Sequence, residues 1–198
     1  MMQKNAENIS GVILAGGENK RFGGINKSNL IIGNLSIITR IINTISDIFT
    51  EIIIVTNTPE EFQPFNHYKI VQDQFFKVGP LAGIHSAIKE SSKEAVFVFA
   101  GDMPFLNKEM IINQIRYFSS CTSDVVIPRV NDYDEPLHAI YRNSIYVQLD
   151  KYLSGNKQYA IRDFLTHVNA NYMQLPESEK TKRAFTNINT PGEVEKAN

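Results

Sequence analysis

The sequence predicts an α/β protein in which a mostly parallel sheet lies between layers of helices. Short runs of β-branched residues alternate along the chain with longer amphipathic segments, which is the pattern of strands followed by helices. The run 95–100 is apolar throughout, as expected of a central strand that is covered on both faces. No Pro/Gly/Ser linker divides the 198 residues, so residues 1–198 are predicted to form one domain.

The first two thirds of the chain give the clearest alternation. Strands are predicted at residues 11–14, 51–55, 68–71, 95–100 and 124–128. The segment 35–48 places isoleucines at helical spacing and is predicted to be a helix. A second helix, 80–90, begins with a proline, which suits a first turn, and a third, 107–118, begins at the N-cap candidate Asn107.

The last third is less regular. Here we expect a strand at 138–141, a helix at 144–152, a short strand at 185–188 and a brief helix after Pro191. Ligands of open α/β sheets bind outside the carboxyl ends of the strands. A site is therefore expected in the loops that follow Leu14, Val55, Val71, Ala100 and Ile188.

Composition narrows the class of partner. Hydrophobic residues make up 42% of the chain, charged residues 21%, and the net charge is -1. This is the balance of a globular protein, and it gives no sign of a nucleic-acid or membrane partner. The single cysteine, Cys121, excludes an internal disulfide and a multi-cysteine metal site. The polar N-terminus and short apolar runs lack a signal peptide or a membrane span, so a cytoplasmic location is expected.

The loop after the first strand predicts phosphate binding. Residues 15–27 contain two glycine pairs and three cations, Lys20, Arg21 and Lys27. Glycines let backbone N–H groups turn toward an anion, and the cations can neutralise a triphosphate. The Walker pattern would need glycine where Asn26 stands, and the dinucleotide pattern Gly-x-Gly-x-x-Gly is absent. A solvated surface loop is the alternative interpretation.

This loop resembles a known signature. Leu14-Ala15-Gly16-Gly17, Arg21-Phe22-Gly23 and Lys27 look like the signature of nucleotidyltransferases with a Rossmann-like sheet, and most of all like the molybdenum cofactor guanylyltransferases. Cytidylyl and uridylyl relatives more often have Ala-Ala-Gly where this chain has Ala-Gly-Gly. The resemblance implies a Rossmann-like three-layer sandwich of the nucleotide-diphospho-sugar transferase type. It also implies that Lys27 and Arg21 are catalytic.

Asp102 is the candidate metal ligand. It follows the most apolar strand, where a carboxylate is well placed to hold Mg²⁺ against phosphates. The resembled family has Asp-x-Pro-Phe/Tyr here with the aspartate as ligand, which makes Asp102 catalytic too. A turn aspartate that caps the next segment is the alternative.

Further motifs extend the resemblance over essentially the whole chain. Gly79-Pro80-Leu81-Ala82-Gly83 is similar to the family's second motif, and Asn187-Ile188-Asn189-Thr190-Pro191 to its closing motif. The alternatives are an ordinary helix start that needs small residues for packing, and a cap that leads into the final helix. Asp73 and Asn57 match polar residues that contact the guanine and ribose, although Asn57 could equally serve a turn. The resemblance implies nucleotide contacts at Leu14, Ala15, Gly16, Gly17, Lys27, Asn57, Asp73, Gly79, Pro80, Leu81, Gly83, Asn187 and Asn189.

Some positions have less definite roles. Residues 135–139 also look familial, with His138 expected to be structural. Lys157 and Arg162 could meet an acceptor phosphate or lie on a solvated helix face. The chain departs from the resembled pattern at Phe22 in place of methionine, at Asn26 in place of aspartate, and at the polar pair Ser28-Asn29.

The resemblance implies a specific reaction. GMP would pass from GTP to the phosphate of molybdopterin, with Mg²⁺, giving the guanine dinucleotide cofactor and pyrophosphate. Molybdenum-cofactor biosynthesis proteins and acceptor molybdoenzymes would follow as partners from that family role. Transfer of CMP to molybdopterin or another small phosphorylated acceptor, and a non-catalytic nucleotide-binding module, are the alternatives.

Overall fold

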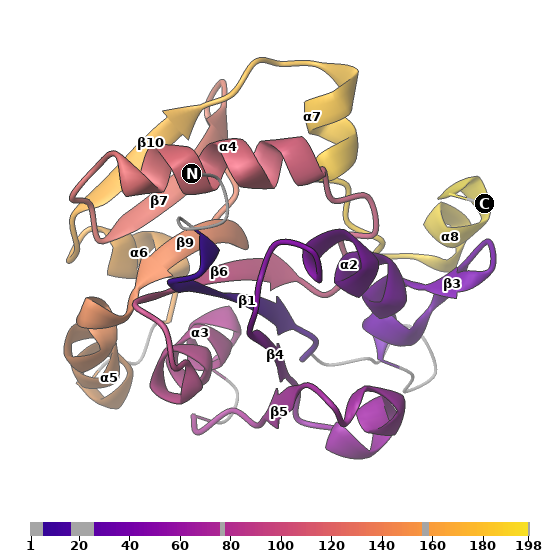
Figure 1. Cartoon of the computed structure of the whole chain (residues 1–198), viewed down its shortest axis with the longest axis horizontal. Helices are drawn as coiled ribbons and strands as arrows, with labels where there is room; N and C mark the ends of the chain where they lie inside the picture. The colour runs from indigo at the N-terminus through magenta and orange to yellow at the C-terminus, as the bar shows by residue number, and fades with distance from the viewer. Residues whose placement is uncertain (1–5, 17–25, 76–77, 156–158, 198) are drawn as a thin grey trace.

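A central sheet of eight strands organises the molecule. The computed structural model of the chain describes residues 6–16, 26–75, 78–155 and 159–197 (Figure 1). The strands lie in the order β10-β7-β9-β6-β1-β4-β5, and β8 pairs with β7. Their bounds are β1 Ile9–Leu14, β4 Ile52–Val55, β5 Lys69–Val71, β6 Ala95–Ala100, β7 Val125–Val130, β8 Tyr133–Asp134, β9 His138–Arg142 and β10 Ala170–Gln174.

The sheet is mixed but mostly parallel, as predicted. Strand β1 runs parallel to β4 and β6, β4 to β5, and β7 to β10. Strand β9 is antiparallel to both of its neighbours, β6 and β7, and β8 is antiparallel to β7. Because β9 runs the other way, its beginning lies at the same edge of the sheet as the end of β6.

Helices cover both faces of the sheet, which gives three layers (Figure 1). One buried cluster joins the sheet to α2 and α4, and the other joins it to α3, α5 and α6. The helices are α2 Ile37–Ile45, α3 Pro80–Glu90, α4 Lys108–Ser119, α5 Tyr146–Gly155, α6 Ile161–Leu165, α7 Glu179–Ala184 and α8 Pro191–Ala197. Three 3₁₀ turns, η2 Lys27–Asn29, η3 Pro59–Phe65 and η4 Asn143–Ile145, and a small hairpin of β2 Ile31–Ile32 and β3 Leu35–Ser36 complete the described fold.

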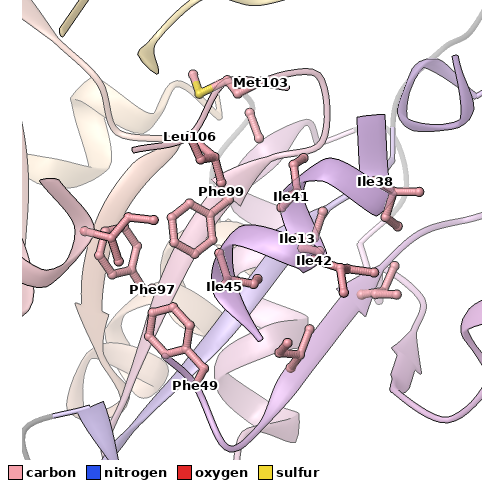
Figure 2. Packing of buried hydrophobic residues seen from close by; sticks show 14 of the residues in the cluster. Ile13, Ile38, Ile41, Ile42, Ile45, Phe49, Phe97, Phe99, Met103 and Leu106 are labelled. Atoms are coloured by element: carbon pink, nitrogen blue, oxygen red, sulfur yellow. The ribbon is translucent and has the colours of Figure 1, made fainter. Parts of the chain in front are cut away.

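The core under α2 is packed from aromatic and branched side chains. Figure 2 shows Phe49, Phe97 and Phe99 beside the isoleucines of α2. The rings of Phe97 and Phe99 stack with centroids 4.4 Å apart, and Phe49 meets both edge-on. Edge-to-face and offset pairs of this kind add about 0.5–1.5 kcal/mol each beyond the area they bury. This packing holds β6, which carries Asp102 at its end, rigidly against the helices.

Three predicted elements differ most from the structure. The helix predicted at 35–48 is shorter, Ile37–Ile45: Leu35 and Ser36 belong to the β2–β3 hairpin, the Ser36 hydroxyl accepts from the Thr39 N–H, and residues 46–48 form a turn. The helix predicted at 144–152 begins as the 3₁₀ turn η4 and continues as α5 to Gly155. The strand predicted at 185–188 is wrong: Phe185 lies in the turn that ends α7, the residues after it join no ladder, and the Ile188 N–H donates to the Asp102 carbonyl at 2.9 Å. Among the described residues, the helices all lack the combination of length and apolar character that crossing a bilayer requires.

Candidate functional site

The expected loops meet at one edge of the sheet. In the parallel ladders Leu14 lies level with Val55 and Ala100, and Val55 lies level with Val71. The chain leaves all four strand ends on the same side, so the loops after β1, β4, β5 and β6 are neighbours in space. This is the edge at which open α/β sheets bind ligands.

The described ends of the glycine-rich loop are tied to the sheet. Ala15 N–H donates to the Val55 carbonyl at 2.8 Å, and Gly16 beyond it is exposed. Gly17 and the catalytic candidate Arg21 lie outside the described residues. At the loop's exit, Lys27 begins the turn η2, and the Asn26 side chain caps that turn by accepting from the Ser28 N–H at 3.0 Å.

Lys27 is the centre of the site. Its Nζ donates to Oδ1 of Asn189 at 2.7 Å and lies 3.6 Å from Oδ2 of Asp102. About a quarter of each of the Lys27 and Asp102 side chains is exposed, so the pair can be reached from solvent. Three residues named from separate sequence motifs therefore converge on one point.

Asp102 is held at the end of β6 by a close approach of two strands. A Cβ on the preceding Gly101 would overlap the Ser28 hydroxyl and lie 2.7 Å from the Leu14 carbonyl oxygen. Glycine at 101 is thus what lets the Asp102 turn pack against β1 and η2. Burial raises the pKa of the Asp102 carboxyl, and the charge of Lys27 only partly opposes that rise. Such a carboxylate favours a cation beside it.

The donor set fits one kind of metal site. Within the ranges that the structure describes, no three His, Cys, Asp or Glu side chains gather closely enough to hold a metal ion. Mg²⁺ commonly binds through one or two carboxylates together with substrate phosphates, rather than in an all-protein cage. Asp102 therefore suits Mg²⁺ that arrives with a triphosphate.

Asp73 and Asn57 form a second polar unit beyond β5 and β4. The Asn57 amide donates to Oδ2 of Asp73 at 2.9 Å, and its Oδ1 accepts from the Asp73 N–H at 3.2 Å. The remaining oxygen of Asp73, Oδ1, is buried and has no hydrogen-bond partner among the described residues. Burial also raises the pKa of this carboxyl. Asp73 therefore has one acceptor oxygen without a partner. Both polar groups of the Asn57 amide are already hydrogen-bonded to Asp73.

The Gly79–Gly83 motif opens helix α3 next to Asp73. Gly79 has a φ of 79°, a conformation that favours glycine, and Pro80 begins the helix. A Cβ on Gly83 would lie 2.9 Å from the Leu14 side chain and 3.5 Å from Oδ1 of Asp73. The Leu81 side chain is fully buried in the core, so only its main chain is left to meet a ligand.

The closing motif returns to the first loop. Asn189 accepts from Lys27, and its N–H and that of Thr190 donate to Oε2 of Glu193 at 2.5 and 3.1 Å. Asn187 Oδ1 is buried without a partner in the described part of the chain. Since Ile188 lies between them and bonds to the Asp102 main chain, both asparagines are placed beside the Lys27–Asp102 pair.

Some side chains near the site had no role assigned from sequence. Glu135 precedes β9 at the edge where β6 ends, and burial together with the charge of Asp102 raises its pKa to about 7. Its carboxylate accepts from the Leu137 N–H. Glu61, in η3, accepts from Asn26 and Asn29. A charged residue in a familial motif was the available signal for Glu135, whereas nothing local marks Glu61.

The residues that have no definite role from sequence differ in their surroundings. His138 is fully buried, its Nδ1 lies 3.2 Å from the Gln114 side-chain oxygen, and burial lowers its pKa to about 4, which fits a structural role. Arg162 is exposed on α6, and Lys157 lies outside the described residues.

Comparison with known proteins gives one consistent result. Residues 11–171 match the family described as the MobA-like NTP transferase domain. The chain is 35% identical to a probable molybdenum cofactor guanylyltransferase of Natranaerobius thermophilus, over 96% of this chain and 95% of that protein. It is 32% identical to the molybdenum cofactor guanylyltransferase of Desulfosudis oleivorans, over 96% and 94%.

A solved structure is similar over almost the same extent. The crystal structure of molybdopterin-guanine dinucleotide biosynthesis protein A from Archaeoglobus fulgidus superposes with a TM-score of 0.78 at 26% identity, covering 95% of this chain and 96% of that one. Sequence and fold therefore point to the same group of proteins.

Proposed function

Because the chain belongs to the MobA-like NTP transferase family, we propose that it transfers GMP from GTP to the phosphate of molybdopterin, releasing pyrophosphate. The products are the guanine dinucleotide form of the cofactor and pyrophosphate. The whole chain, 1–198, acts as one nucleotidyltransferase unit in this proposal. The names of the relatives support the reaction, and the site supplies groups for each part of it.

One observation carries the proposal: Lys27, Asp102 and Asn189 meet at the carboxyl edge of the sheet. Lys27 closes the glycine-rich loop, Asp102 lies in the turn after the most buried strand, and Asn189 comes from the far end of the chain. A cation and a desolvated carboxylate side by side can bind a metal–triphosphate complex, because the lysine meets the phosphates and the carboxylate meets the metal.

In this proposal the Lys27–Asp102 pair and the Asp73–Asn57 pair contact different parts of the nucleotide. The triphosphate lies on the loop that begins at Ala15, with Lys27 and Arg21 neutralising its charge. Asp102 would hold Mg²⁺ there together with phosphate oxygens, and the ion would add to that neutralisation. The unmatched oxygen of Asp73 takes a donor from the guanine or the ribose, since a buried acceptor without a partner costs free energy.

The chemistry needs little from the protein beyond position and charge. An oxygen of the terminal phosphate of molybdopterin forms a bond to the α-phosphorus of GTP. The bond from that phosphorus to the bridging oxygen of the β-phosphate breaks, and pyrophosphate leaves with the electron pair. The attacking phosphate is already ionised, so no strong base is required. Lys27 stabilises the charge that develops on the transferred group.

The partners follow from the reaction. GTP and molybdopterin are the substrates. Molybdenum-cofactor biosynthesis proteins would supply the acceptor, and molybdoenzymes would receive the product.

A turnover assay with four nucleotides tests the proposal. We expect pyrophosphate release from GTP when molybdopterin and Mg²⁺ are present, and at least about tenfold less from CTP, UTP or ATP. Pyrophosphate release that prefers CTP would overturn the choice of base. Tight GTP binding with no release in the presence of acceptor would mean that the chain is a binding module rather than an enzyme.

A further inference from the structure

Asn26 joins the two ends of the glycine-rich loop. The residue is 3% exposed. The Nδ2 group donates to the Ala15 carbonyl at 2.6 Å, and the Oδ1 atom accepts from the Ser28 N–H at 3.0 Å. Ala15 is the last buried residue before the loop, and Ser28 lies in the turn after it. The Asn26 amide therefore links the two ends of the loop, between residues that are eleven positions apart in the sequence.

The same residue is fixed from a second side. The Asn26 main-chain N–H donates to Oε2 of Glu61 at 3.1 Å, and the Asn29 side chain lies 3.4 Å from the same oxygen. Ala15 in turn is bonded to Val55 at the end of β4. Asn26 is thus anchored to the sheet through Ala15 and to η3 through Glu61, and neither anchor involves a nucleotide.

Lys27 lies between these two anchors and the site. It follows Asn26 directly and begins η2, the turn that Asn26 caps. The direction in which Lys27 leaves the main chain is therefore set by Asn26, while its Nζ reaches Asn189 and Asp102. The hydrogen bonds of the Asn26 side chain go to Ala15 and Ser28, and it reaches the site through Lys27.

We propose that Asn26 is a positioning residue that closes the base of the phosphate loop and fixes Lys27 toward the triphosphate; this rests on the proposed function of the site. It acts through the bond from its amide to Ala15. An aspartate, which the resembled signature often carries at this position, could still accept from Ser28 but could not donate to Ala15. In this chain the nearby carboxylate is that of Glu61, which accepts from the Asn26 main-chain N–H.

The test is a double-mutant cycle between Asn26 and Lys27 in the full chain. Asn26→Asp preserves the shape and the acceptor for Ser28 but removes the donor to Ala15. Asn26→Ala removes both. Each is combined with Lys27→Ala. Asn43→Asp, the same chemical change at an exposed position of α2, is the matched control. Turnover of GTP with molybdopterin and the dissociation constant of Mg–GTP, measured by calorimetry, are the two readouts.

We expect Asn26→Asp and Asn26→Ala each to lower kcat by about 10- to 10²-fold, because a misplaced catalytic group costs rates of that order. In the Lys27→Ala background the same changes should cost less than about twofold, since the group that they misplace is gone. Asn43→Asp should match the unmodified protein. Because Asn26→Asp is nearly isosteric, the double-mutant cycle can be completed with this variant even where Asn26→Ala does not fold.

Two results would overturn the proposal. One is an Asn26→Asp variant with unchanged kcat and unchanged Mg–GTP affinity. The other is a cycle in which the losses from Asn26 and Lys27 simply multiply, as for a residue that only stabilises the fold. If the unmodified chain releases no pyrophosphate, the proposed function fails, and the cycle read by Mg–GTP affinity still decides the role of Asn26.

Discussion

Lys27 is the side chain on which the proposed reaction depends most at the residue scale. Lys27→Ala and Asp102→Ala should each lower turnover by roughly 10²–10³-fold while the protein stays folded, by analogy with loss of one oxyanion-hole donor. Lys108→Ala, which removes an exposed lysine paired with Asp47, is the control and should leave turnover unchanged. Steady-state pyrophosphate release measures all three. Near-normal turnover in either site variant would remove that residue from the mechanism.

Asp73 should decide how tightly the nucleotide is held rather than how fast it reacts. Asp73→Asn replaces the unmatched buried oxygen with a group that can be a donor, which opposes the donor of the nucleotide. We expect KM for GTP to rise by about 10-fold or more, with kcat within about threefold of the original value. A GTP titration under saturating acceptor measures both constants. An unchanged KM would show that Asp73 does not face the nucleotide.

His138 makes stability depend on pH in a direction that can be worked out. Burial lowers its folded-state pKa to about 4 from the ordinary 6.5, so between these values the unfolded chain binds the extra proton. The contribution is complete above pH 6.5 and is lost as pH falls toward 4, by at most about 3 kcal/mol. Asp73, Asp102 and Glu135, whose pKa values are raised, act in the opposite sense.

Comparison with His138→Phe isolates that contribution. The variant should lose stability at neutral pH, because the Gln114 side-chain oxygen loses its partner. Its urea midpoint should then fall less than that of the unmodified protein between pH 6.5 and pH 4. Parallel midpoint curves across this range would show that His138 does not stay neutral in the folded state.

The sequence indicated the charged residues of the site but not the contacts between them. Lys27 and Asp102 stand in motifs whose composition alone suggests phosphate and metal binding. Asn26 and Glu61 could not be assigned in the same way, because each acts through a partner outside its own motif. Asn26 looked like a departure from a pattern, and only its distance to Ala15 gives it a role.

Gly101 lies where the chain after β6 packs against β1 and η2, so its substitution should disturb both contacts. A Cβ there would overlap the Ser28 hydroxyl and press on the Leu14 carbonyl, so β1 and η2 would have to move away from the end of β6. Gly101→Ala should lower the free energy of unfolding by about 1–3 kcal/mol, the usual cost of overpacking. Gly155→Ala, where an added Cβ meets nothing within 4 Å, is the matched control and should be nearly neutral. Urea unfolding of the two variants makes the comparison.

Element prediction succeeded where periodicity and burial agree. The run 95–100 is a fully buried strand, and the isoleucines of α2 all face the core. It failed at 185–188, where Phe185 lies in the turn that ends α7 and the Ile188 N–H pairs with the Asp102 carbonyl of a loop rather than with a strand. The strand β10 was missed because its residues are only half-buried and show no clear alternation. Pairing partners, rather than propensity, decide such segments.

At the scale of the whole molecule, nucleotide binding should stabilise the fold, because the site joins segments from both ends of the chain. Mg–GTP at about 100 times its dissociation constant adds about 2.7 kcal/mol, which for a chain of this size raises Tm by about 5–10 °C. Thermal unfolding with and without Mg–GTP measures the shift. Asp102→Ala at the same ligand concentration should show a smaller one, and an equal shift would place the bound complex elsewhere.

The return of the closing segment to the first loop has a consequence for the time at which the site is completed. Lys27 bonds to Asn189, 162 positions later, and the Asp102 turn is tied to Ile188. During synthesis on a ribosome, the glycine-rich loop and the Asp102 turn emerge long before the asparagines that contact them. A nascent chain can therefore form most of its sheet before the Lys27–Asn189 and Asp102–Ile188 contacts exist, so under the proposed function nucleotide binding would be completed only after Asn189 has emerged.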